Sequence, residues 1–380
     1  MSETEQGAQG NAQGVALSIE GLKVDFHTFA GDVKALDGVE LALKKGEILG
    51  LVGESGCGKS VTALAVAGLL PDNAKVLGGR IMLEGQDLLK MSKSEMRIAR
   101  LKEIAFVFQD PMTYLNPVLS VGSQLTEILT SDSKMFLKEL VESRLAEIET
   151  MHKSTGGPHP DLEEEQRRLE VAETKSKLSK SEIKRLAKMH AINYLKMVRL
   201  PDPNRAYRMF PFELSGGMRQ RAMIAMALVR RPKVLLADEI TTALDVTVQA
   251  QVLKLLNEMK EEIDASVILI THDLAVVAEV CDRVAVMYAG SIVEVADVQE
   301  LFSNPLHPYT RGLLESIPRP DEYSPNLKSI AGSVPNLIFP PPGCRFNPRC
   351  PKAFARCPAV KPHLIEASKG HFVACFLYGG

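Results

Sequence analysis

The segment from Gly53 to Ser60 constrains the fold more than any other part of this 380-residue sequence. It reads G-x-x-x-x-G-K-S and stands between an apolar, strand-like run at 47–52 and a helix-like run at 61–70. Strand, glycine-rich loop and helix in this order predict a phosphate-binding loop in an α/β fold. Glycines let backbone N–H groups turn toward phosphate oxygens, and the helix N-terminus adds donors and a favourable dipole. The alternative is an ordinary glycine-rich turn that happens to contain Lys and Ser.

This loop predicts contacts with ATP and with a magnesium ion. Lys59 can reach the terminal phosphates, and the Ser60 hydroxyl can ligate Mg²⁺. The residues expected to bind ATP here are Gly53, Glu54, Ser55, Gly56, Cys57, Gly58, Lys59, Ser60 and Val61. Phe29 or Phe26 could stack on the adenine ring, and either could equally be a core aromatic residue.

The composition is that of a globular chain long enough for two domains, or for one large domain with an appendage. With 45 basic and 47 acidic residues, nothing suggests nucleic acid as a partner. No apolar run reaches the ~18–20 residues that span a bilayer. Residues 1–14 lack a basic start and an apolar stretch, so they are expected to form a disordered tail rather than a signal peptide. We therefore expect an intracellular protein that meets a membrane only through partners.

Polar side chains end three further strand-like runs. Gln109 follows the run at 104–108, Asp238 and Glu239 follow 234–237, and the run at 266–270 ends at Thr271 and His272. In open α/β sheets, residues of phosphate sites collect at such strand ends. We expect Asp238 to hold Mg²⁺ beside Ser60, Glu239 to be the general base, and His272 to contact the γ-phosphate. Solvated strand ends and a structural histidine are the alternatives.

Two other regions predict what surrounds this core. Residues 16–46 alternate in a strand-like way, which predicts an antiparallel sheet beside the nucleotide core. Residues 120–213 are mainly helical in pattern. Within them, 134–151 and 161–200 form two long, charged arms around a Gly-Pro turn at 156–160, which predicts an antiparallel helical hairpin.

Ser215, Gly216 and Gly217 open an Ala/Met-rich helix and offer backbone N–H groups for a phosphate. With these residues, the motifs resemble those of the ATP-binding subunits of ABC transporters over about 16–300. The matching motifs, all in the family's order, are the loop 53–60, Gln109, the Leu-Ser-Gly-Gly of 214–217, Asp238 with Glu239, the loop 243–245 and His272.

The resemblance narrows to the oligopeptide/dipeptide permease ATPases through the segments 109–117, 304–314 and 343–351. It implies an ABC nucleotide-binding domain at 15–300, with an antiparallel β flank and a helical subdomain at about 112–232. A small cysteine-containing C-terminal domain would follow at 301–380. The chain departs from the family in two places: Ile240 replaces a proline, and the helical region carries an extra hairpin at about 132–188.

The resemblance implies Mg²⁺-dependent ATP hydrolysis coupled to import of peptides, or of nickel or oligosaccharides. Gln109, Glu239 and His272 would be catalytic, and Ser60, Gln109 and Asp238 would hold Mg²⁺. The signature residues Ser215, Gly216, Gly217 and Gln220 would contact ATP bound to a partner, and Asp245 would lie in a dimer loop. The implied partners are a second, related ATPase subunit, two membrane permease subunits and an extracellular or periplasmic solute-binding protein. The chain would lie at the cytoplasmic face of the membrane.

Four cysteines, Cys344, Cys350, Cys357 and Cys375, crowd into the C-terminal region. In a cytosolic protein, such a group of cysteines favours a metal site over disulfide bonds. The spacing indicates zinc only weakly, because no C-x-x-C pair is present. The pairs Cys350-Pro351 and Cys357-Pro358 are similar to the Cys-Pro ends of iron–sulfur ligand sequences. The permease tail that this region resembles binds a [4Fe–4S] cluster in some members. Zinc and merely clustered thiols or disulfides are the alternatives.

Two other kinds of ABC protein are alternatives to an importer subunit. A soluble ABC ATPase of DNA repair or translation would carry zinc modules, long coiled-coil arms or two cassettes, whereas this chain has one cassette and a transporter-type tail. A non-hydrolytic regulatory subunit would lack Glu239, His272 or Ser215, and all three are present.

Overall fold

A computed structural model describes residues 14–110, 114–131, 133–155, 160–175, 178–242, 244–316 and 330–379. The chain forms two compact units. The first comprises Met1–Gln109, Arg231–Ile240 and Lys260–Gly380, and the second comprises Asp110–Arg230 and Thr241–Met259. The disordered tail predicted at 1–14 lies outside the described residues except for Gly14, and so does most of the predicted turn at 156–160.

The first unit contains an eight-stranded sheet in the order β11-β12-β10-β9-β3-β8-β7-β6. Strands β9, β3, β8, β7 and β6 run parallel. Every residue of β3 and β8 is buried, as expected for parallel strands covered on both faces. The strands are β3 (Ile48–Val52), β6 (Ile104–Val107), β7 (Val234–Asp238), β8 (Ser266–Thr271), β9 (Arg283–Tyr288), β10 (Ser291–Asp297), β11 (Ile365–Ser368) and β12 (His371–Val373).

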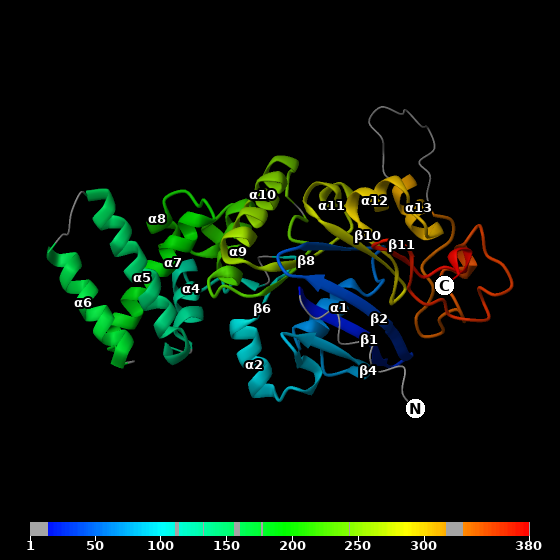
Figure 1. Cartoon of the computed structure of the whole chain (residues 1–380), viewed down its shortest axis with the longest axis horizontal. Helices are drawn as coiled ribbons and strands as arrows, with labels where there is room; N and C mark the ends of the chain where they lie inside the picture. The colour runs from blue at the N-terminus through cyan, green and yellow to red at the C-terminus, as the bar shows by residue number, and fades with distance from the viewer. Residues whose placement is uncertain are drawn as a thin grey trace. The chain divides into compact units, whose positions relative to one another are not determined.

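A second sheet of the same unit is antiparallel, in the order β2-β1-β4-β5, and β1, β2 and β4 lie side by side in Figure 1. Its strands are β1 (Val15–Thr28), β2 (Gly31–Lys44), β4 (Ala74–Leu83) and β5 (Gln86–Asp87). Alternating side chains of β1, among them Leu17, Ile19, Leu22 and Val24, belong to the hydrophobic core. The antiparallel flank predicted from residues 16–46 is therefore confirmed.

Helices complete the first unit. Helix α2 begins with a capping box, in which Ser92 and Glu95 satisfy each other's backbone N–H groups. The helices and 3₁₀ turns are α1 (Lys59–Val66), η1 (Leu88–Lys90), α2 (Lys93–Lys102), α11 (Leu274–Val280), α12 (Val298–Ser303), α13 (Pro308–Glu315), η3 (Asn347–Arg349) and η4 (Phe376–Tyr378).

The C-terminal segment extends the main sheet of this unit. Strand β12 pairs antiparallel with β10, with Glu294 opposite Val373, and β11 pairs with β12 at the sheet edge. The fully buried His371 lies with its Nε2 2.8 Å from Oε1 of Glu294. That carboxylate also accepts the N–H groups of Leu306 and His307, so α13 and the last strands are joined at one buried group.

The second unit is helical, as predicted for residues 120–213. Helix α5 packs against both α6 and α7. The helices are α4 (Val121–Thr130), α5 (Ser133–Thr155), α6 (Pro160–Lys175), α7 (Lys180–Met197), α8 (Pro203–Arg208), η2 (Pro211–Glu213), α9 (Gly216–Leu228) and the part of α10 (Val246–Ile263) up to Met259. Within the described ranges, no helix is both long enough and apolar enough to cross a membrane.

One detail of the predicted hairpin is wrong. The expected second arm at 161–200 consists of two helices, because α6 ends at Lys175 and α7 starts afresh at Lys180. Ser179 and Glu182 form a capping box at this start, which satisfies N–H groups that a continuous helix would pair internally.

Candidate functional site

The loop between β3 and α1 has the shape that its glycines permit. Gly53 has φ +154°, and a Cβ there would lie 2.1 Å from the carbonyl oxygen of Met287 in β9. Only a glycine allows the two backbones to approach so closely. Gly58, with φ +110°, occupies the position before the first residue of α1, so the loop leads directly into the helix N-terminus.

Lys59 folds back over this loop. Its Nζ donates hydrogen bonds to the carbonyl oxygens of Gly53, at 2.8 Å, and Glu54, at 3.1 Å, and the residue is buried. The ammonium group therefore lies inside the loop, beside the N-terminus of α1. Both favour an anion, so this corner of the first unit is suited to phosphate groups.

The three predicted catalytic residues meet at the carboxyl ends of β6, β7 and β8. Gln109 Nε2 donates to Oε2 of Glu239 at 2.7 Å, and His272 Nδ1 lies 3.2 Å from Oε1 of the same carboxylate. The backbone N–H of Glu239 donates to the carbonyl oxygen of Ile270, at the end of β8. Glu239 itself has φ +47°, an uncommon value for a non-glycine residue. The carboxylate is thus held by neighbours from both adjoining strands.

Asp238 carries the strongest signal for a cation. Its Oδ1 is buried and has no hydrogen-bond partner among the described residues. Burial raises the pKa of this carboxyl, and the charge of Glu239 adds to the rise, while a hydrogen bond from Ser60 and the charge of Lys59 oppose it. A buried, unpaired carboxylate oxygen beside a serine hydroxyl fits the oxygen ligands that Mg²⁺ prefers.

A cavity of about 580 Å³ lies over the loop. It is lined by Phe26, Thr28, Val33, Ala35, Ser55, Gly56, Gly58, Lys59, Ser60, Val61, Asn73, Gln109, Glu239 and Leu337. Of the two candidate adenine-stacking residues, Phe26 lines the cavity, whereas Phe29 is fully exposed at the tip of the β1–β2 hairpin and does not. Leu337, from the C-terminal segment, also lines the cavity. The sequence does not predict this, because no motif contains Leu337. Its carbonyl oxygen accepts the N–H of Lys34 at 2.9 Å, which ties it to β2.

The signature residues lie in the second unit. Ser215 is the N-cap of α9 and accepts the N–H of Met218. A Cβ on Gly217 would lie 2.7 Å from Val248 Cγ1, so a glycine is needed where α9 meets the start of α10. Asp245 accepts the N–H of Val248 at 3.0 Å. Gln220 is buried. The signature helix and the Asp245 loop are therefore neighbours within this unit.

The four C-terminal cysteines line one small cavity. Its other walls come mainly from aromatic and apolar side chains, including Phe346, Phe354 and Phe376. All four are free thiols. Across the described residues, no three His, Cys, Asp or Glu side chains converge on a point that could hold a single metal ion.

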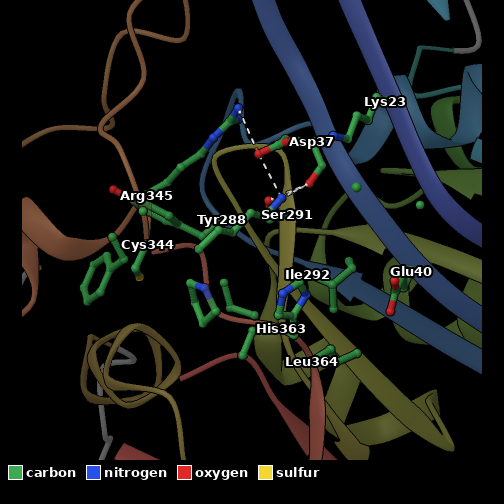
Figure 2. Close-up of a pocket in the computed structure, with 18 residues that line it drawn as sticks. Lys23, Asp37, Glu40, Tyr288, Ser291, Ile292, Cys344, Arg345, His363 and Leu364 are labelled. Carbon is green, nitrogen blue, oxygen red and sulfur yellow. Dashed lines mark hydrogen bonds and ion pairs between the residues drawn. The ribbon is translucent and has the colours of Figure 1, made fainter. Parts of the chain in front are cut away.

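Another cavity, of about 300 Å³, lies between the β1–β2 strands, the β9–β10 hairpin and the C-terminal segment (Figure 2). Arg345 points toward Asp37 there, with Nη2 3.5 Å from Oδ2, and Lys361 Nζ lies 2.8 Å from the same oxygen. These contacts hold the pKa of Asp37 below its usual value, although burial alone would raise it. The cysteine-bearing segment is thereby anchored to the antiparallel sheet.

Comparison with known proteins identifies two family matches. The ABC transporter family model matches residues 36–242, and the model of the oligopeptide/dipeptide transporter C-terminal region matches residues 293–357. The dipeptide transport ATP-binding protein DppD of Bacillus subtilis is 44% identical over 362 residues, which cover 95% of this chain and 94% of DppD. The oligopeptide transport ATP-binding protein OppD of Escherichia coli is 42% identical over 360 residues, which cover 95% and 92% of the two chains.

Solved structures show the same fold. The structure of cbiO1 from Clostridium perfringens, part of the ABC transporter complex cbiONQ, superposes with a TM-score of 0.55 at 25% identity and covers 77% of this chain and 92% of cbiO1. A dimeric ATP-binding cassette in a post-hydrolysis state with ADP and Pi gives a TM-score of 0.55 at 23% identity, over 74% and 98% of the two chains.

Proposed function

The chain belongs to the ABC transporter ATP-binding proteins of the oligopeptide/dipeptide transport family, and from this premise we propose that it hydrolyses ATP to drive the import of peptides or a related solute. The observation that carries the proposal is the convergence of Gln109 and His272 on Glu239, next to the phosphate loop. Nickel and oligosaccharides remain the other solutes that the family resemblance implies.

In the proposed reaction, the loop and Lys59 bind the β- and γ-phosphates. Ser60, Asp238 and Gln109 would hold Mg²⁺, and the bound ion would supply positive charge for those phosphates. Glu239 accepts a proton from the attacking water or orients it. Gln109 and His272 hold that carboxylate in place, and His272 contacts the γ-phosphate. The orphaned Asp238 oxygen supports the magnesium assignment.

The site is proposed to be completed by a second ATPase subunit. Ser215, Gly216 and Gly217 would contact ATP held by that partner, since the first N–H groups of a helix have no partner within the helix. Gln220, the fourth contact that the resemblance implies, is only 2% exposed in the single chain. Asp245 would lie at the same interface, because it is a neighbour of the signature within its unit. We propose a related but different chain as the partner, together with two membrane permease subunits and an extracellular or periplasmic solute-binding protein. The chain would then work at the cytoplasmic face of the membrane.

Replacing Glu239 by Gln tests the assigned chemistry. We expect ATP turnover to fall by about 100-fold or more, since a positioned general base contributes on this scale. ATP binding should persist, because the phosphate loop is unchanged. Steady-state hydrolysis measured with this chain assembled with its partner ATPase subunit decides this, and turnover equal to wild type would mean that the base is another residue.

A second proposal concerns the four cysteines, which we infer to hold a [4Fe–4S] cluster of structural role. Four thiols lining one largely apolar cavity support it. Zinc is the other metal that four cysteine thiolates hold, in a tetrahedral arrangement around one ion. A cluster instead takes one thiolate for each iron, so its ligands stand further apart.

Anaerobic purification tests the cluster. We expect brown protein with about four iron atoms per chain, as the Cys₄ ligand set of such clusters requires. Chelation of the iron should lower the melting temperature, because metal binding contributes to folding. Colourless protein with one equivalent of zinc would contradict the proposal.

A further inference from the structure

Arg349 joins the cysteine-bearing segment to the phosphate loop. It ends η3, directly before Cys350, and its Nη1 and Nη2 lie 2.7 and 3.0 Å from the two carboxylate oxygens of Glu54. The side chain of Arg349 is only 6% exposed and that of Glu54 26%. The contact bridges 295 positions of the sequence within one compact unit.

The guanidinium of Arg349 is held from the other side by backbone. Its Nε donates to the carbonyl oxygen of Ala331 at 2.9 Å, and its Nη2 also donates to that of Ile330 at 3.3 Å. Nη1 reaches the Tyr288 hydroxyl at 3.4 Å. A planar fork with five donors fits this set of acceptors, whereas a lysine could not bind both oxygens of Glu54 in the same geometry.

Helix α13 holds the backbone of the same loop residue. The N–H of Glu54 donates to the hydroxyl of Tyr309 at 2.9 Å, and Tyr309 is fully buried. The ring of Tyr309 packs against Tyr288 and Phe346, with centroids 4.6 and 5.4 Å apart. Both the N–H and the side chain of Glu54 are therefore turned toward the C-terminal region, and Glu54 does not line the nucleotide cavity.

We propose that Arg349 is a positioning residue for the phosphate loop. A carboxylate in a phosphate-binding loop repels the polyphosphate unless its charge is paired and drawn aside, and Arg349 does both. The affinity for ATP then depends on the segment that carries the cysteines. The inference rests on the proposed binding of ATP to the loop.

The test is a double-mutant cycle on the dissociation constant of MgATP, measured with the full-length protein. Arg349→Met should weaken binding by about tenfold, the scale of one lost charge-assisted contact. In a Glu54→Gln background, the same Arg349→Met change should alter the dissociation constant by less than about threefold, because no charge is left to pair. In the assembled transporter, Arg349→Met should raise KM for ATP and leave kcat within about twofold, since binding is lost equally before and in the transition state.

Arg356→Met is the matched control. It lies in the same segment, is exposed, and stacks over the Phe376 ring at 4.2 Å rather than on the loop, so MgATP binding should not change. Should Arg349→Met fail to fold, Arg349→Lys keeps the charge and loses the fork, and should weaken binding by about threefold. Unchanged binding in folded Arg349 variants, or the same loss in both Glu54 backgrounds, would overturn the inference and leave the proposed function standing. Failure of wild type to bind MgATP would instead overturn the proposed function.

Discussion

Single residues of the phosphate loop show which conformations its sequence permits. Gly53 and Gly56 both have positive φ, at +154° and +77°, but their surroundings differ. A side chain on Gly53 would run into the Met287 carbonyl oxygen, while nothing lies within 4 Å of a Cβ on Gly56. A side chain at either position meets a positive φ, but only at Gly53 does it also meet a steric clash. The difference between the two substitutions therefore measures the effect of the clash.

We expect Gly53→Ala to lower the free energy of unfolding by about 3 kcal/mol, because β3 and β9 must part to admit the methyl group. Gly56→Ala should cost only about 1–2 kcal/mol, the price of a left-handed alanine. Chemical denaturation of the two variants measures the difference. Equal losses would show that the close approach to Met287 does not matter.

At the scale of elements, helices α5, α6 and α7 meet at one buried arginine. Arg144 of α5 is 7% exposed, and its guanidinium contacts Glu147 of the same helix at 2.8 Å and Glu165 of α6 at 3.0 Å. Arg185 of α7 reaches Glu165 at 2.9 Å. The charges of these helices are therefore not all on a solvated face, because Arg144, Glu165 and Arg185 meet across three helices.

Removing Arg144 should therefore destabilise these helices. Arg144→Met removes the buried guanidinium that pairs with Glu147 and Glu165, and leaves Glu165 only its contact with Arg185, so we expect the free energy of unfolding to fall by about 3 kcal/mol. Arg167→Met is the matched control, since Arg167 is 75% exposed and pairs with Glu163 one turn away, and should cost less than about 0.5 kcal/mol. Hydrogen exchange along α5 and α6 measures both. Equal protection in the two variants would contradict the role given to Arg144.

The same cluster predicts a dependence on pH. Burial alone would raise the pKa of Glu165, but hydrogen bonds and charge from Arg144 and Arg185 outweigh it and hold the pKa below the usual 4.5. A depressed pKa means that the stabilisation is complete above about pH 4.5 and is lost as the pH falls through the folded value. Protection of the α6 amides, measured as the exchange rate relative to an unfolded chain at the same pH, should therefore fall in that acidic range for wild type, and much less for Glu165→Gln.

At the scale of the whole molecule, the sequence predicts the features that short, local motifs encode. The loop at 53–60, the strand-end residues Gln109, Glu239 and His272, and the antiparallel flank all follow from short motifs or alternation. The S-x-x-E motif at Ser179 also predicts a capping box, and therefore the start of a new helix within the second helical arm. No local motif predicts the contact between Glu54 and Arg349, or the position of Leu337 in the lining of the nucleotide cavity. Both depend on how segments distant in sequence fold back on the sheet.

The most direct measurement of the central claim is peptide uptake into vesicles that hold this chain with its membrane subunits, partner ATPase and solute-binding protein. Wild type should import peptide only when ATP is present on the side of the ATPase subunits. With Glu239→Gln, import should fall by about 100-fold or more while ATP is still bound, since the base contributes on that scale. Uptake that continues without ATP, or that survives loss of Glu239, would contradict a role in ATP-driven import.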